Sequence, residues 1–493
     1  MQANQWIEKA NKEKSMPRVR AYCTFVIALL ALIVVAAATP AYAQTFSALY
    51  DFGTQTFNAL NPEGAVAQGR DGALYSTSPS GGGNNWGSVF KVTPAGKEMV
   101  VYSFCSATKC ADGSTPVGGL TLRLNGHFIG TTTSTGPELG LGTIFDVSQT
   151  GTLTTLYTFT GGADGATPLA PPILGPDGSF YGTAQSGGKV LCGTIYRLTG
   201  SAFEVVHNFS KVNGCSPAAA LVLGTDGNLY GTTAAGGTGG GGVVFQLQLP
   251  MSKAPVFTVL TNFSSSNGQP LSALVEGSDG NFYGTTSAAP GSVFSVTPTG
   301  TLTIVHALNG STDGSNPYTG LALATDGNFY GTAYNGGGFD GGTLFQVTPT
   351  GDFSVLYNFG AEGEGFYQIN DNPEATPFQN TNGLLYGDTF YGGGGGGCNG
   401  ESGCGMFYSW ADSLPASVST VPFFGKVGST VEILGQGFTS ATTVSFNGTP
   451  ATATVVSGDY LSATVPAGAT TGFVTVTTSS GTLTSNRQFV VAP

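Results

Sequence analysis

The stretch "DGNFYGTAYNGGGFDGGTLFQVTPTGDFSVLYNF", residues 326–359, decides the fold. Its Asp-Gly pair predicts a two-residue hairpin turn, because glycine tolerates the positive φ that such a turn requires. "NFYGTA", "TLFQVT" and "DFSVLYNF" have the alternation of strands and are separated by a glycine-rich loop and the turn "PTG". Together with "GLALAT" just before it, the stretch predicts a four-stranded antiparallel meander.

Close copies of this pattern recur along most of the chain. The gaps between the glycines of successive turn dipeptides are 54, 52, 49, 53, 47 and 56 residues. A period near fifty residues, with several strands in each unit, is typical of β-propeller blades. We therefore expect seven blades, which begin around the dipeptides Asp71-Gly72, Asn125-Gly126, Asp177-Gly178, Asp226-Gly227, Asp279-Gly280, Asp326-Gly327 and Asn382-Gly383.

The seventh copy lacks its fourth strand. After "GMFYSW", residues 405–410, the chain continues into "ADSLPASVS", which has no strand of the "FSVLYNF" kind. Residues 45–52, "TFSALYDF", have the missing pattern. We therefore expect the N-terminal strand to complete the seventh blade and close the ring, which removes exposed sheet edges. An open solenoid is the alternative, and it gives no reason for the divided copy.

Composition supports an all-β chain outside the cytosol. Of the 493 residues, 9% are charged and 78 are glycine, against about 25% charged residues in a typical soluble protein. Disorder is disfavoured because 40% of the residues are hydrophobic and occur in strand-like runs. The net charge of −12 disfavours a nucleic-acid partner, which requires basic patches.

The first 43 residues have the pattern of a secretory signal peptide. Basic residues precede the apolar run "CTFVIALLALIVVAAA", and Ala41-Tyr42-Ala43 forms a small-residue cleavage site. A retained membrane anchor is the alternative. Cys23 opens the apolar run instead of closing it, which argues against a lipoprotein. Cleavage after Ala43 removes five basic and two acidic residues and changes the net charge from −12 to −15. We expect a secreted or cell-surface protein with no membrane span after cleavage.

The repeat resembles a known family of exported bacterial proteins. The segment "DGNLYGTTAAGGTGGGGVVFQL", residues 226–247, resembles the GloVer tandem repeat, and the resemblance covers roughly residues 45–410. It implies a "choice-of-anchor" protein, in which the C-terminal attachment module varies, and it implies no established catalytic activity. Two copies depart from the pattern, since Ile129 replaces the repeated Tyr and Asp388 replaces the Thr of "YGT".

The C-terminal region has a different sequence pattern, without the glycine doublets of the repeat. Apolar and polar residues alternate through about seven short strands, which predicts an immunoglobulin-like β-sandwich. The segments "VEILGQGF", "VSFNG", "ATVPAGATTG" and "VTVTTSSG" resemble the IPT/TIG domain, which implies a spacer or a sugar- or surface-binding unit. The expected organisation is a signal peptide at 1–43, a seven-bladed propeller at 44–412 and an IPT/TIG domain at 413–493.

The order of strands predicts which loops share a face of the propeller. The Asp-Gly hairpins lie on one face, while the glycine-rich loops and the connections between blades lie on the other. Six cysteines remain after cleavage, and all map to the second face. In an exported chain we expect disulfides; zinc is the alternative, but no histidine adjoins a cysteine. The expected pairs are Cys105 with Cys110, Cys192 with Cys215, and Cys398 with Cys404.

Candidate chemistry lies in the longest connection, "GAEGEGFYQINDNPEATP", residues 360–377. Its carboxylates could bind Ca²⁺ or act as an acid/base pair, although an acidic loop is more often simply solvated and no EF-hand spacing is present. They are the weak catalytic candidates Glu362, Glu364, Asp371 and Glu374. Asx-turn chemistry accounts for the aspartates of the other connections, which are Asp112, Asp164 and Asp313.

Aromatic and histidine side chains give weaker signals. Trp86, in the first glycine-rich loop, could stack on a sugar ring, whereas Trp410 falls at a core position. His207 and His306 align with tyrosines in the fourth strands and therefore occupy a structural position, and His127 is expected to face solvent. No G-x-S-x-G elbow, P-loop or H-E-x-x-H motif occurs in the sequence.

The sequence thus favours an exported, non-enzymatic propeller that binds glycans or other surface ligands or builds the cell exterior. An extracellular polysaccharide hydrolase or lyase that uses the loop carboxylates is the alternative, and a calcium-stabilised structural repeat is the third hypothesis. No cofactor or metal site is expected, with Ca²⁺ left open. Fold alone does not decide among these functions.

Overall fold

The computed structural model describes most of the chain after the predicted signal peptide, which lies outside the described residues. No helix among the described residues is long and apolar enough to cross a membrane. The described residues are 44–136, 138–250, 253–360, 371–394, 398 and 403–492.

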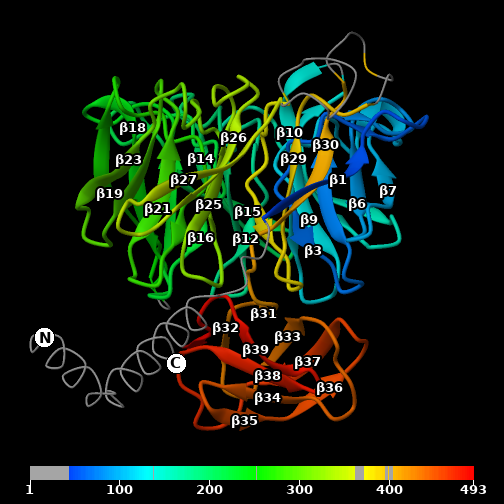
Figure 1. Ribbon diagram of the computed structural model, residues 1–493. Helices are drawn as coiled ribbons and strands as arrows, with labels where there is room; N and C mark the ends of the chain where they lie inside the picture. The colour runs from blue at the N-terminus through cyan, green and yellow to red at the C-terminus, as the bar shows by residue number, and fades with distance from the viewer. Residues whose placement is uncertain are drawn as a thin grey trace, which may run out of the picture. The chain divides into compact units, whose positions relative to one another are not determined.

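Seven four-stranded antiparallel sheets form the blades within the described residues (Figure 1). Their strands are, in blade 1, β3 (Ala67–Gln68), β4 (Leu74–Ser78), β6 (Ser88–Val92) and β7 (Glu98–Ser103); in blade 2, β8 (Leu120–Leu122), β9 (Phe128–Thr135), β10 (Glu138–Val147) and β11 (Leu153–Thr158); in blade 3, β12 (Ile173–Leu174), β13 (Phe180–Ala184), β14 (Thr194–Thr199) and β15 (Ala202–Asn208); in blade 4, β16 (Val222–Leu223), β17 (Leu229–Thr233), β18 (Gly240–Gln248) and β19 (Val256–Ser264); in blade 5, β20 (Val275–Glu276), β21 (Phe282–Thr286), β22 (Ser292–Val296) and β23 (Leu302–Ala307); in blade 6, β24 (Ala322–Leu323), β25 (Phe329–Ala333), β26 (Thr343–Val347) and β27 (Phe353–Asn358); and in blade 7, β28 (Phe378–Gln379), β29 (Leu385–Thr389), β30 (Met406–Ala411) and β1 (Thr45–Asp51). A short ribbon of β2 (Ala59–Leu60) and β5 (Ser80–Gly81) and the 3₁₀ turn η1 (Thr108–Cys110) complete the propeller.

The N-terminal strand closes the ring, as the sequence predicted. β1 pairs antiparallel with β30, and Phe46 lies opposite Trp410. The ring of Phe46 also stacks on Tyr357 of blade 6 at 4.0 Å between centroids. The seventh blade is therefore a four-stranded sheet made from the two ends of the propeller, and the open solenoid is wrong.

The geometry of the Asp-Gly hairpins explains why the same residues recur in successive copies of the repeat. In blade 6 the Oδ1 atom of Asp326 accepts the backbone N–H of Asn328 at 3.0 Å, and Gly327 has φ of 83°. The hydroxyl of Tyr330 donates to Asp326 Oδ2 at 3.0 Å. Four other blades repeat this contact between the Asp of the turn and the Tyr of "FYGT". The dipeptide and the tyrosine therefore form one structural unit.

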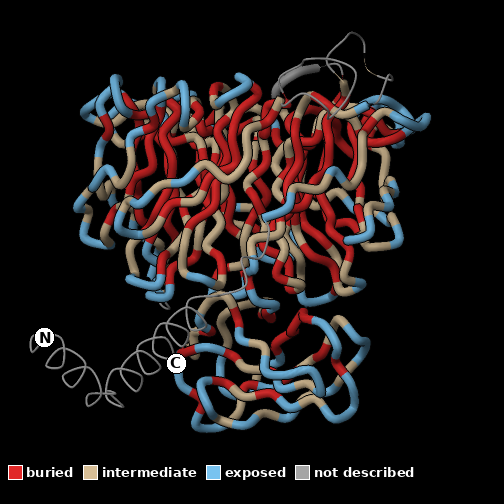
Figure 2. Tube along the Cα trace, in the orientation of Figure 1, coloured by how far each residue is buried: buried red, intermediate tan, exposed pale blue. Residues whose placement is uncertain are grey.

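The core lies between blades. Figure 2 shows the strands buried along their middles, with exposed residues concentrated at the loops. Each aromatic cluster joins two blades; Tyr283 of blade 5, for example, packs with Phe329 and Phe345 of blade 6. First strands of neighbouring blades contact one another at two junctions, where β3 lies beside β8 and β20 beside β24. A single blade buries too little apolar surface alone, so the stacking stabilises the ring.

The C-terminal region is a β-sandwich with its own core of buried valine, phenylalanine and leucine side chains. Its strands are β31 (Ser417–Val421), β32 (Phe424–Lys426), β33 (Thr430–Leu434), β34 (Thr443–Phe446), β35 (Thr449–Ala451), β36 (Ala453–Val455), β37 (Tyr460–Thr464), β38 (Val474–Thr478), β39 (Gly481–Ser485) and β40 (Val490–Ala492). β31 pairs with β33 in one sheet and with β39 in the other.

Contacts to the sandwich come from the hairpin face of the propeller. Arg70, beside the first Asp-Gly turn, forms an ion pair with Glu432 of β33. The backbone N–H of Ser417 donates to Thr381 O at 2.9 Å, beside the last such turn. The glycine-rich loops, which lie on the opposite face, contribute no contact of this kind among those described.

Candidate functional site

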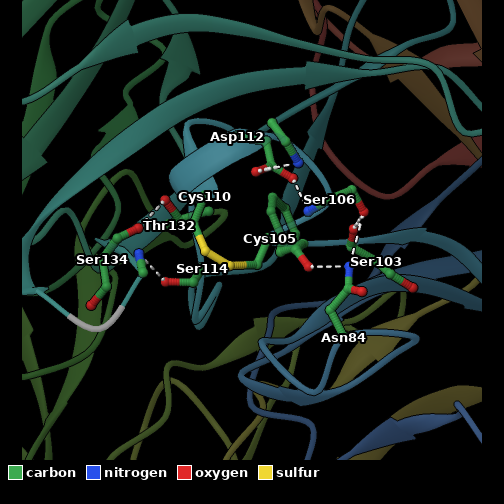
Figure 3. Close-up of a disulfide and its surroundings, with 12 residues drawn as sticks. Asn84, Ser103, Cys105, Ser106, Cys110, Asp112, Ser114, Thr132 and Ser134 are labelled. Carbon is green, nitrogen blue, oxygen red and sulfur yellow. Dashed lines mark hydrogen bonds between the residues drawn. A yellow bond between two sulfur atoms is a disulfide. The ribbon is translucent and has the colours of Figure 1, made fainter.

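Three disulfides tie loops on the glycine-rich face. The structure joins Cys105 to Cys110, Cys192 to Cys215, and Cys398 to Cys404, the same pairs that their position on one face predicted. Figure 3 shows the first of these between Ser103 and Ser114, beside Thr132 and Ser134 of the next strand. The cysteines therefore have a structural role in loops that carry few other constraints.

The aspartates of the "DG" connections have structural partners. Asp112 accepts the backbone N–H groups of Ser106 at 2.9 Å and Ala107 at 3.2 Å, and the hydroxyl of Tyr102 at 2.8 Å. Asp164 repeats this arrangement with Thr160 and Tyr157. These bonds account for the carboxylates without a ligand, in agreement with the turn interpretation.

The histidines of the fourth strands replace those tyrosines. His306 Nε2 lies 3.0 Å from Asp313 Oδ2, and the ring stacks on Phe353. His207 stacks on Phe257 at 3.7 Å, and burial lowers its pKa to about 4. His127 is partly exposed but contacts Asp146, so it does not simply face solvent.

Two other predicted residues have clear positions. Trp410 is buried between blades 6 and 7, at the expected core position. Trp86 is 37% exposed in its loop, and its carbonyl accepts the N–H of Thr115 at 2.9 Å. Its indole is therefore accessible, but no other aromatic candidate for a sugar lies beside it among the described ring contacts.

Two of the four predicted carboxylates, Asp371 and Glu374, lie within the described residues. Glu362 and Glu364 lie outside the described residues. Asp371 is buried and accepts the backbone N–H of Gly360 at 3.0 Å, and burial raises its pKa to about 6. Of these two, Glu374 lies close enough to Glu63 and Asp388 for its charge to act on them, and the sequence did not single out either of these carboxylates as a candidate.

A repeated backbone geometry places Glu374 near the axis. Every connection between blades ends in a residue of positive φ followed by proline; in blade 7 these are Asn372, with φ of 48°, and Pro373. Asparagine tolerates this left-handed region better than most residues. The residue after each proline therefore occupies an equivalent position just before the first strand, and these residues are Glu63, Val117, Leu169, Ala218, Leu271, Tyr318 and Glu374.

Asparagine side chains fix three neighbouring members of this ring. The amide of Asn316 donates to Ser287 O at 3.2 Å, that of Asn372 to Tyr334 O at 2.8 Å, and that of Asn61 to Phe390 O at 2.7 Å. Each bond joins one blade to the blade before it. The residues held next to these asparagines are the polar ones of the ring, whereas the four other positions are apolar.

Asp388 breaks a second repeated contact. In the other blades a threonine of "YGT" bonds to the connection that enters the next blade; Thr232, for example, donates to Ser272 O at 3.1 Å. Asp388 takes this position between blades 7 and 1. The carbonyl it would meet, that of Gly64, accepts the hydroxyl of Ser76 at 2.6 Å instead. Asp388 is 0% exposed, and both of its carboxylate oxygens lack a hydrogen-bond partner in the described structure.

These departures converge on the junction of blades 7 and 1. We define the seam cluster as Glu63, Glu374, Asp388, Tyr318 and Tyr334. Glu63, Glu374 and Tyr334 are half-buried, and Tyr318 is 39% exposed, so solvent reaches the cluster from the glycine-rich face. The rings of Tyr318 and Tyr334 lie 5.3 Å apart between centroids.

The electrostatics of the cluster favour protonated carboxyls. Burial, with the nearby charge of Glu374, raises the pKa of Glu63 to about 8. Burial raises the pKa of Glu374 to about 7. Burial and the charges of Glu374 and Glu63 raise the pKa of Asp388 well above its usual range. Burial and these same glutamates raise the pKa of Tyr334 to about 12. Such grouped shifts are typical of functional sites.

Sequence reasoning missed Glu63 and the role of Asp388. Two signals were available, since "NPE" occurs at both 61–63 and 372–374, and Asp388 is a visible departure from "YGT". Neither signal shows by itself that blades 1 and 7 bring the residues together. Among the described residues, no three Asp, Glu, His or Cys side chains are arranged to hold a metal ion.

Family models match nearly the whole chain. The Gloeobacter/Verrucomicrobia repeat matches residues 34–173 and 170–402, and the IPT/TIG domain matches residues 415–491. A search of curated proteins gives no match.

Solved structures match the chain at low identity. A putative 6-phosphogluconolactonase from Bacteroides uniformis is 16% identical with a TM-score of 0.42, over 61% of this chain and 86% of its own. A protein of unknown function from Bacteroides thetaiotaomicron is 15% identical with a TM-score of 0.38, over 66% of this chain and 81% of its own. These likenesses are too distant to bear on activity.

Proposed function

The chain belongs to the Gloeobacter/Verrucomicrobia repeat family and ends in an IPT/TIG domain, and from this premise we propose that it is an exported, non-enzymatic glycan-binding protein. In this proposal the glycine-rich face of the propeller binds the ligand. The protein acts outside the cell or on its surface, and the sandwich serves as a spacer on the other face.

The observation that carries the proposal is the convergence of repeat departures. The propeller repeats the same turn, tyrosine and threonine contacts in blade after blade, and it breaks this pattern where Glu63, Glu374 and Asp388 meet. Sites at which a sequence breaks its own structural rules at a cost in stability are expected to be functional. Tyr318 and Tyr334 supply aromatic surface at the same place, as sugar rings require.

Location and the second face support the same proposal. The three disulfides fit an oxidising compartment. The ion pair between Arg70 and Glu432 joins the sandwich to the hairpin face, so the two domains leave the glycine-rich face to a ligand.

A polysaccharide hydrolase or lyase is the second candidate, and one observation favours it. Glu374, with a pKa of about 7, and Glu63, with a pKa of about 8, are tuned as general acids of glycoside hydrolysis often are. Binding ranks first because both carboxyls are raised in the same direction, and a general acid needs a partner carboxylate that stays ionised.

A glycan array probed with residues 44–493 tests the proposal, followed by a product assay on every glycan that binds. We expect binding without release of shorter products. Absence of binding to any glycan would contradict the proposed function. Product formation that disappears in Glu374→Gln would establish the enzyme instead, because the substitution keeps the size of the side chain and removes its proton donor.

A further inference from the structure

We propose that the seam cluster binds the protonated amine of an amino-sugar glycan. This inference rests on the proposed function and specifies its ligand. Asp388 is fully buried at the junction of blades 7 and 1, has no hydrogen-bond partner in the described structure, and lies close enough to Glu63 and Glu374 for their charges to act on it. The same two charges act on Tyr334, whose ring lies 5.3 Å from that of Tyr318.

The carboxyls lack a counter-ion within the described structure. The charges that act on Glu63 and Asp388 come from other members of the cluster, and no arginine, lysine or histidine lowers the pKa of any of the three. Glu432, by contrast, is a buried carboxylate that is paired with Arg70. Burying carboxyls without a cation destabilises a protein. A cationic ligand would offset this loss of stability, which would account for the buried carboxyls.

The geometry favours an organic ammonium over a metal ion. A calcium site needs six to eight oxygen atoms about 2.3–2.6 Å from one point. No three acidic, histidine or cysteine side chains of the described residues are arranged in this way. An ammonium group needs only hydrogen-bond acceptors at about 2.8 Å and gains further from an aromatic face within about 6 Å. In this proposal Glu63 and Glu374 are the acceptors, and Tyr318 and Tyr334 supply the aromatic faces.

The rest of the ring fits a sugar. Beyond the polar positions, the residue after proline is apolar in blades 2 to 5, namely Val117, Leu169, Ala218 and Leu271. The mouth of the axis therefore has an acidic and aromatic side and an apolar side. An amino sugar matches this division, because its ring presents C–H groups to aromatic and apolar surfaces and its amine to the carboxyls.

Binding of an ammonium must be linked to proton release. A nearby positive charge stabilises the ionised carboxylates, so binding lowers their pKa values and expels protons. The groups that face these carboxyls within the described residues are other members of the cluster together with Tyr391 and Tyr408. Burial raises the pKa values of Tyr334 and Tyr408, so these two phenols stay neutral near pH 7 and the released protons come from the carboxyls.

The test uses two ligands that differ only in the amine. Residues 44–493 are titrated calorimetrically with the glucosamine tetramer and with the N-acetylglucosamine tetramer at pH 6.5, in two buffers of different ionisation enthalpy. We expect at least tenfold tighter binding of the free amine, with net proton release. Glu374→Gln and Glu63→Gln should each weaken binding of the glucosamine tetramer about tenfold or more. Glu204→Gln, which removes an exposed carboxylate beside Arg197, is the charge-matched control and should have no effect.

Several outcomes would overturn the inference. Equal affinity for the two tetramers, or unchanged binding in both seam variants, would show that the amine is not recognised there. Calcium chloride that binds with micromolar affinity and is lost in Glu374→Gln would assign the cluster to a metal. If other glycans bind on the array while the glucosamine tetramer does not, this inference fails and the proposed function stands. If no glycan binds, the proposed function fails as well.

Discussion

Within the described part of the chain, the junction between blades 6 and 7 has buried hydrogen bonds that the junction between blades 7 and 1 lacks. Between blades 6 and 7, Thr332 is fully buried and bonds to Thr319 at 2.8 Å, and its hydroxyl also lies 3.5 Å from the carbonyl of Ala375. Between blades 7 and 1, Asp388 occupies the same place and is equally buried, and neither carboxylate oxygen has a hydrogen-bond partner among the described residues. A carboxyl where a hydroxyl would serve costs stability, because its charged form loses solvation without compensation. The difference indicates that the closing junction is shaped by something besides folding.

The largest expected effect comes from placing a carboxylate at a junction that has the usual threonine, such as the one between blades 4 and 5. Thr232→Asp should lower the free energy of unfolding by about 3–5 kcal/mol at pH 7, because the position is 1% exposed and a carboxylate there loses its solvation. The loss should shrink at pH 4, where the new side chain enters the fold neutral. Urea unfolding at both pH values measures this.

Thr232→Ser is the control for Thr232→Asp, since it keeps the hydroxyl that donates to Ser272 O. A Thr232→Asp protein as stable as the wild type would mean that any junction accepts a carboxyl, and Asp388 would lose its significance.

Removing two of the disulfides in turn should distinguish effects on stability from effects on glycan binding. Removing Cys192–Cys215, whose cysteines are 23 residues apart, should cost about 3 kcal/mol, and removing Cys398–Cys404, 6 residues apart, about 2 kcal/mol. The second pair adjoins the seam, since the carbonyl of Cys404 accepts the N–H of Asn61 at 2.8 Å.

Only the double serine variant of Cys398 and Cys404 should therefore weaken glycan binding, although it is the less destabilised of the two. Thermal melts and calorimetric titration of both double variants provide the measurement. Equal losses of affinity would mean that the disulfides act on binding only through global stability.

Restoring the repeat at the seam should stabilise the fold. Asp388→Thr should raise the free energy of unfolding by about 1–2 kcal/mol at pH 8, where the wild type pays most for its buried carboxyl. A group whose pKa is raised on folding supports the fold below its unfolded pKa and loses that support as the pH rises. The gain should therefore be smaller at pH 4.5 than at pH 8. Unfolding in urea across this range tests the sign, and a gain that is larger at low pH would contradict the neutral state of Asp388.

The fold could be predicted because its signals are local and repeated. Asp326, Gly327 and Tyr330 form a turn and a strand whose contacts lie within four residues, and the spacing of the copies supplies the blade count. The unpaired strand at 45–52 has a single place to pair, so the closure followed as well.

The site could not be predicted in the same way, because its contacts join the two ends of the ring. Glu63 and Asp388 are separated by most of the propeller, and their proximity depends on the closed geometry. The sequence also does not show that the Gly64 carbonyl has a different hydrogen-bond donor at this junction. Ser76 replaces the glycine of "YGT" in blade 1, and only the structure shows that its hydroxyl takes the Gly64 carbonyl. The acidic loop at 360–377 was predicted as the candidate site because its carboxylates are close together in the sequence. Carboxylates from the two ends of the propeller come close only when the ring closes, and the sequence does not show this.

The smallest expected effect compares two buried tyrosines in equivalent positions of the third strand. Tyr196 and Tyr408 both have hydroxyls without a partner in the described structure, and phenylalanine fills this position in the other blades. Tyr196→Phe should stabilise the protein by less than about 1 kcal/mol at every pH, because it removes a buried hydroxyl that makes no bond. Tyr408 differs, since the charge of Asp388 acts on its hydroxyl. Its removal should therefore give a similar gain at pH 5 and little or none at pH 8, where the phenol is the polar group best placed to stabilise an ionising Asp388. Urea unfolding of both variants at the two pH values decides it, and two gains that are equally independent of pH would show that the seam carboxyl remains neutral throughout this range.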